Sequence, residues 1–92
     1  MSVIVETQSG SRYEFDTDLK KVRRLGNKNG NPPTDYMGQD GWWKEYEWVR
    51  LWLWPDGNPS LIIWWAMETH TRTSPLVDTS VVVELGMGEW IG

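Results

Sequence analysis

The sequence contains no cysteine, and this absence excludes disulfide bonds, cysteine zinc sites and thiol nucleophiles. A small domain without disulfides must be held by its apolar core, which favours a cytoplasmic location. Alanine, the strongest helix former, occurs only at Ala66, so a helical bundle is disfavoured. The start of the chain lacks the pattern of a signal peptide, and no apolar run approaches the roughly 18 residues of a membrane span. We therefore expect a soluble protein that is neither exported nor inserted in a membrane.

What the sequence does hold is a high proportion of tryptophan in a short, acidic chain. The 92 residues include eight Trp, and the length predicts a single domain over residues 1–92. Residues 1–30 contain six Lys or Arg against four Asp or Glu, a net charge of +2. Residues 31–92 contain three against nine, a net charge of −6. This balance disfavours nucleic acid as a partner, because binding to its backbone depends on several Lys and Arg contacts.

The N-terminal part of the sequence has the pattern of β-strands. Residues 2–16 alternate in polarity on both sides of a Ser-Gly-Ser turn, which predicts a hairpin with Tyr13 and Phe15 on its core face. The segment KKVRRL at residues 20–25 fits either a third strand or a helical turn. We favour a strand at the edge of the sheet, since edge strands commonly carry Lys and Arg.

The centre of the chain predicts a loop and then a second, longer hairpin. Gly, Pro and Asn dominate residues 26–41, which is typical of a long loop. An aromatic run over residues 42–54 and an apolar run over residues 60–67 flank a strong turn signal at residues 55–59.

The remainder predicts a polar loop over residues 68–75 and a last strand over residues 76–85. Residues 86–92 either form a frayed tail or cap an open end of the core with Trp90 and Ile91. The predicted fold class is therefore all-β, a small antiparallel barrel or sandwich of five to six strands.

The aromatic run has two interpretations. If it is a strand, alternation places seven side chains on one face: Trp42, Lys44, Tyr46, Trp48, Arg50, Trp52 and Trp54. These rings either fill the core, with the basic side chains stacked over them, or several are exposed and form a contact surface. The opposite face and the neighbouring strands already offer enough apolar residues for a small core. We take the seven residues as the candidate binding site.

No residue pattern points to catalysis, a metal or a cofactor. The single histidine, His70, lies in a predicted polar loop without a nucleophile elbow. Glu45 and Glu47 resemble the paired carboxylates of glycoside hydrolases, but so short a chain rarely builds a deep cleft. One His and scattered carboxylates do not form a zinc or calcium site. We predict that the protein is not an enzyme and binds no metal or cofactor.

Three strings of the sequence carry a resemblance to a protein group. They are ETQSGSRYEFDTDLKKVRRL at residues 6–25, WWKEY at residues 42–46 and TRTSPLV at residues 71–77. They resemble small uncharacterised accessory proteins of phages that infect actinobacteria, and the resemblance covers the two ends better than the Trp-rich centre. It implies an accessory factor in the host cytoplasm and supplies no catalytic residue or cofactor.

The leading functional hypothesis is a non-enzymatic module that binds a host protein, or a second copy of itself as a homodimer, through the aromatic strand. The alternative is a small-ligand module whose rings stack on a sugar or a nucleotide. A small hydrolase that uses His70 is the least favoured hypothesis. Nucleic acid and membrane are not expected as partners.

Overall fold

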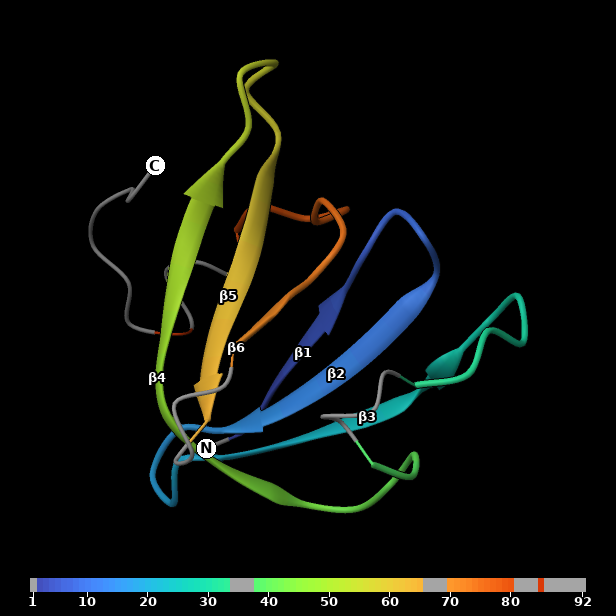
Figure 1. The fold of residues 1–92 in the computed structure, drawn as a ribbon, viewed down its shortest axis with the longest axis vertical. Coiled ribbons are helices and arrows are strands. Elements are labelled where there is room, and N and C mark those ends of the chain that lie inside the picture. Colours follow the sequence, from blue (N-terminus) through green and yellow to red (C-terminus); the bar gives the residue numbers. More distant parts are fainter. Residues whose placement is uncertain (1, 34–37, 66–69, 81–84, 86–92) are drawn as a thin grey trace.

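The computed structural model describes residues 2–33, 38–65, 70–80 and 85, and these residues form a six-stranded antiparallel sheet (Figure 1). Each strand pairs with the next along the chain. The described ranges contain no helix, so the all-β prediction is confirmed. The described part of the sheet is not closed between its first and last strands, so the barrel form stays a prediction. The strands are β1 (Ser2–Glu6), β2 (Ser11–Asp16), β3 (Lys21–Asn27), β4 (Lys44–Leu53), β5 (Pro59–Trp65) and β6 (His70–Arg72).

The predicted first hairpin is confirmed by the pairing of β1 with β2. Val3 pairs with Phe15 and Val5 with Tyr13, and all four side chains are buried on one face, as the alternation predicts. Gly10 adopts a positive φ of 93° in the turn, a conformation that glycine tolerates without strain.

Residues 20–25 belong to a strand, which resolves the two alternatives left open by the sequence. The turn before β3 is fixed by Asp16, whose carboxylate accepts hydrogen bonds from the backbone N–H groups of Asp18 and Leu19. The prediction of an edge position is wrong, because β3 pairs with β2 on one side and with the start of β4 on the other. Its basic side chains have a structural use instead: Arg23 and Arg24 bind carboxylates.

The second predicted hairpin is also confirmed, with β4 paired to β5 through seven residue pairs. The turn between them spans residues 54–58, where Trp54 and Asn58 are joined by a backbone hydrogen bond and Asp56 accepts one from the N–H of Asn58. Gly57 supplies the positive φ that this turn requires.

The C-terminal predictions need correction. Residues 70–72 form β6, where the sequence predicted a loop, because Thr71 lies buried on the core side and accepts a hydrogen bond from the indole N–H of Trp65. Leu76 makes a single bridge to Thr7 and residues 77–80 form a bend and a turn, so the predicted strand over residues 76–85 does not begin there. Residues 81–84 of that strand and the predicted tail over residues 86–92 lie outside the described residues.

The core lies between two halves of the sheet, β1–β3 and β4–β6, which occupy opposite sides of the molecule (Figure 1). Phe15 at its centre has no exposed surface, and its ring meets that of Tyr46 edge to face at 5.8 Å. The buried apolar side chains are Val3, Val5, Tyr13, Phe15 and Val22 from the first half, and Leu51, Leu61, Ile63, Trp65 and Leu76 from the remainder.

Arg24 fastens the long loop to the sheet. Its side chain is only 3% exposed and donates hydrogen bonds to both carboxylate oxygens of Asp40 and to the backbone carbonyl of Asn31. The backbone carbonyl of Arg24 also accepts a hydrogen bond from the N–H of Gly41. The predicted loop over residues 26–41 begins later than expected, after Asn27, and the two parts of it that the structure describes both meet at this arginine.

The replacement Arg24→Met should lower the free energy of unfolding by about 2 kcal/mol or more, because charge-assisted hydrogen bonds from a buried group are lost. Arg23→Met is the matched control: Arg23 pairs with Glu14 closer to the surface, so its loss should cost less than about 1 kcal/mol. Urea denaturation of both variants measures the difference. Equal losses would contradict the role assigned to Arg24.

Stability should also fall at alkaline pH. Burial raises the pKa of the Tyr13 phenol above its ordinary value, an effect that the Arg24 guanidinium partly opposes. When folding raises the pKa of a phenol, its contribution to stability is complete at pH values below the unfolded-state pKa of about 10. That contribution is lost as the pH rises through the folded-state pKa. Tyr13→Phe should therefore flatten the decline in urea midpoint above about pH 10, whereas an unchanged decline would contradict the assignment.

Candidate functional site

The face of β4–β6 that points away from the core gathers aromatic and basic side chains. The registers place Trp48 beside Trp64 and Trp64 beside His70 in one row, and Arg50, Ile62 and Arg72 in the next. Directly paired residues in an antiparallel sheet point to the same side, so these rows share one surface. We call it the Trp/Arg face, and it consists of Trp48, Arg50, Trp52, Trp54, Ile62, Trp64, His70 and Arg72.

Three rings of the Trp/Arg face form a stack across the strands. The indoles of Trp48 and Trp64 lie 5.0 Å apart with 15° between their planes, and the imidazole of His70 lies 5.7 Å from Trp64 at 8°. The guanidinium of Arg50 lies over the Trp48 ring at 4.1 Å. The stack thus runs from a cation through two indoles to an imidazole, so neighbouring groups cover both Trp rings.

A second cluster of the face forms around Arg72. Its guanidinium lies 4.5 Å from the ring centre of Trp54 and 5.6 Å from that of Trp52. The indole N–H of Trp54 donates to the hydroxyl of Ser60 at 2.7 Å, whereas the indole nitrogen of Trp52 is covered and has no acceptor among the described residues. The rings are therefore held in place, and one hydrogen-bond donor remains unsatisfied.

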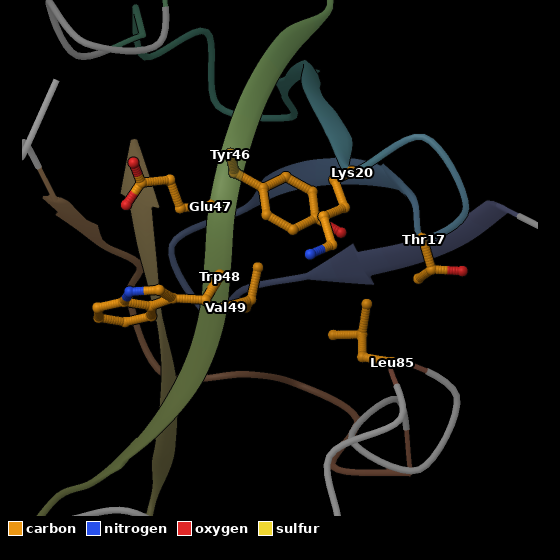
Figure 2. A pocket seen from close by; sticks show the side chains of 7 residues that line it. All are labelled: Thr17, Lys20, Tyr46, Glu47, Trp48, Val49 and Leu85. Atoms are coloured by element: carbon orange, nitrogen blue, oxygen red, sulfur yellow. The ribbon is translucent and has the colours of Figure 1, made fainter. Parts of the chain in front are cut away.

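An irregularity in β4 determines which side chains reach this face. The register shifts between Tyr46 and Trp48, so Tyr46 pairs with Trp65 and Trp48 pairs with Trp64. Glu47 is the extra residue of this β-bulge. Figure 2 shows Tyr46 on one side of β4, near Lys20, and both Glu47 and Trp48 on the other. Glu47 therefore borders the Trp/Arg face.

The bulge corrects the predicted site. Tyr46 does not share a face with Trp48, as strict alternation required; its ring packs on Phe15 at the core. Lys44 pairs with Val22 of β3, and its ammonium lies over the ring of Trp42 at 5.3 Å, so these two predicted residues lie outside the Trp/Arg face. Of the seven candidates, the structure brings together four: Trp48, Arg50, Trp52 and Trp54.

Four members of the face were missed by the sequence argument: Ile62, Trp64, His70 and Arg72. A signal existed for Trp64, because adjacent Trp64 and Trp65 in a strand must point to opposite sides, and only one can lie in the core. His70 and Arg72 had no such signal, since the polar residues around them are typical of a loop.

Neither of two cavities on the described surface joins groups suited to catalysis. A half-open cavity of about 240 Å³ next to the bulge is lined by Thr17, Lys20, Tyr46, Glu47 and Val49, among others (Figure 2). Burial raises the pKa of the Tyr46 phenol, and the nearby Asp16 carboxylate adds to this effect, so the phenol there is neutral near pH 7. The second cavity, of about 170 Å³, adjoins Arg24, whose donors already bind the loop.

Within the part of the chain that the structure describes, no cluster of three or more His, Asp or Glu has the geometry to hold a metal ion. The same residues include no helix with the length and apolarity that crossing a bilayer demands.

Comparison with known proteins adds no relationship: no family model, no curated protein and no solved structure matches this chain.

The stack makes a quantitative prediction. A double-mutant cycle on Trp48→Leu and Trp64→Leu should give a coupling energy of about 0.5–1.5 kcal/mol, because the rings touch in the folded protein. A second cycle on Trp48 and Trp42, which the fold keeps apart, should give a coupling near zero. Urea denaturation of the single and double variants measures both values. Equal coupling in the two cycles would contradict the stacked arrangement.

Proposed function

We propose that the protein is a non-enzymatic protein-binding module and that the Trp/Arg face is its contact surface. The observation that carries this proposal is the position of four Trp, one Ile and two Arg on the side of β4–β6 that points away from the core. Trp and Arg are the residues most enriched among those that dominate binding energy at protein interfaces. The four Trp rings are half-buried, and a patch of partly exposed apolar rings beside exposed charged side chains is typical of a partner site.

The side chains of the Trp/Arg face are already fixed in the free protein, and this also favours binding. A long or aromatic side chain loses conformational freedom when a partner immobilises it, and this loss weakens association. Here the Trp48 ring already contacts Trp64 and Arg50, and the Trp54 ring contacts Arg72 and donates a hydrogen bond to Ser60. The conformational entropy of these side chains is therefore largely lost on folding, so that less is lost when a partner binds.

The core does not require these rings. Ten buried apolar residues form it, and Trp65 is the one tryptophan among them. The adjacent Trp64 lies on the opposite side of the same strand. The hypothesis that the aromatic row fills the core is thus less well supported than the hypothesis of a contact surface.

The alternative function, recognition of a sugar or nucleotide by ring stacking, has less support. Such ligands bind to a free aromatic face. Arg50 and Trp64 lie over the Trp48 ring, His70 lies over the Trp64 ring, and Arg72 lies over the Trp54 ring. A protein partner can bind instead to the ring edges and the guanidinium groups.

The proposed biological setting is that of a phage accessory factor that acts on a host protein in the host cytoplasm, and this setting depends on the sequence resemblance alone. Under this proposal the protein uses no cofactor, and its partner is a protein and not a membrane or a nucleic acid.

Trp52→Ala separates the surface role from a core role. Trp52 lies half-buried on the outer face, so its removal should cost about 1 kcal/mol of folding stability, whereas removal of a core tryptophan costs about 3–5 kcal/mol. Trp65→Ala, on the other face of the same hairpin, is the matched core control. In capture from an actinobacterial lysate, Trp52→Ala should lose proteins that the parent retains, because a hot-spot residue contributes about 2 kcal/mol or more to binding.

Trp42→Ala is the control for binding, because Trp42 is 55% exposed but lies outside the Trp/Arg face. It should capture the same proteins as the parent. If Trp52→Ala unfolds as readily as Trp65→Ala, or captures what the parent captures, the proposal is wrong.

A further inference from the structure

We propose that the partner of the Trp/Arg face is an acidic polypeptide segment, in which carboxylates flank an apolar residue. This inference depends on the proposed protein-binding function and adds the chemical class of the partner.

The first support is the state of the arginines. Arg23 and Arg24, on β3, each bind a carboxylate of this chain, Glu14 and Asp40 respectively. Arg50 and Arg72 are exposed and lie over indole rings, and neither forms an ion pair with any described residue. The Trp/Arg face thus presents two arginines that form no ion pair with the described carboxylates, on a chain whose net charge is −4.

The second support is an excess of donors over acceptors. The two guanidinium groups are exposed and carry only hydrogen-bond donors. The hydroxyl of Ser60 already accepts from Trp54. A partner rich in carboxylate oxygens supplies acceptors that this face lacks.

The third support is the spacing of the two arginines across the sheet. Arg50, Ile62 and Arg72 are direct neighbours in the register across β4, β5 and β6. Neighbouring strands lie about 4.8 Å apart, so the two arginine backbones are roughly 10 Å apart with the Ile62 side chain between them. A segment whose acidic residues lie on both sides of an apolar residue matches this row.

Two other occupants fit less well. A two-fold dimer centred on the row of Arg50, Ile62 and Arg72 would bring these arginines close to the arginines of the second copy, and like charges in contact disfavour association. Single-stranded nucleic acid stacks its bases on open ring faces and adds a negative charge at every nucleotide. Here cations and other rings cover the indoles, and the remaining residues of the chain carry a net charge of −6. A segment with two or three carboxylates adds only the charges that the arginines neutralise.

The test is selection from a library of random peptides displayed on phage, with the full chain as bait. We expect the parent to select peptides enriched in Asp and Glu next to apolar residues. The double variant Arg50→Gln/Arg72→Gln should bind the consensus peptide at least about tenfold more weakly, measured by calorimetry. The variant Arg12→Gln/Lys28→Gln removes the same charge from exposed positions outside the face and should bind like the parent.

Glu47→Gln supplies a variant with the opposite expectation. Because Glu47 borders the face, its carboxylate repels an acidic segment, and its removal should strengthen binding by about two- to threefold. Damage to the fold cannot produce a gain in affinity. Stronger binding by Glu47→Gln together with weaker binding by the double arginine variant would support the inference.

The outcomes that overturn the inference are distinct. Selected peptides without acidic enrichment, or equal binding by the double arginine variant, would refute an acidic partner and leave the protein-binding proposal standing. No selection above background would contradict both. Tighter binding of oligothymidylate than of the consensus peptide would indicate nucleic acid, and a dimer in sedimentation that Trp52→Ala dissociates would indicate a second copy.

Discussion

The β-bulge at Glu47 is the constraint on which the rest of the structure depends. It lies where β4 passes from its pairing with β3 to its pairing with β5: the N–H of Tyr46 still bonds to the carbonyl of Lys20, while Tyr46 itself pairs with Trp65. The extra residue reverses the alternation, so Tyr46 reaches the core and Trp48 reaches the outer face. One inserted position therefore supplies both the core ring and the candidate binding surface.

The same arrangement explains how so small a fold accommodates so many indoles. Among the seven tryptophans that the structure describes, only Trp65 belongs to the core, where Thr71 accepts its N–H. Five others have a Lys or Arg head group within about 6 Å of the ring centre, the range in which cation–π attraction acts. Each such contact covers part of an apolar surface with a charged group, so the basic residues both shield the rings and fix their positions. On β4–β6 this leaves an ordered surface of Trp and Arg side chains.

The sequence predicts those parts of the fold that depend on local rules. Two hairpins follow from turn residues and alternation, and the inward position of Tyr13 and Phe15 follows from a period of two. It does not predict the bulge, because a single inserted residue leaves the aromatic pattern of residues 42–54 unchanged. Nor does it predict β6, because this strand depends on pairing with β5 and on the Thr71 hydroxyl, which accepts from Trp65. Just after the strand, the Thr73 hydroxyl accepts from the N–H of Leu61. The candidate site was accordingly half predicted: its β4 residues followed from alternation, whereas those of β5 and β6 depended on pairing.

The most direct test of this account is a nuclear Overhauser measurement on the free protein, directed at Tyr46 and Trp48. If the bulge divides them, the Tyr46 ring protons will show contacts to Phe15, and the Trp48 indole protons will show contacts to Trp64 and none to Phe15. Contacts of both Tyr46 and Trp48 with the Trp64 ring would mean that β4 alternates without interruption. That result would contradict the separation of core and contact surface on which the proposed function depends.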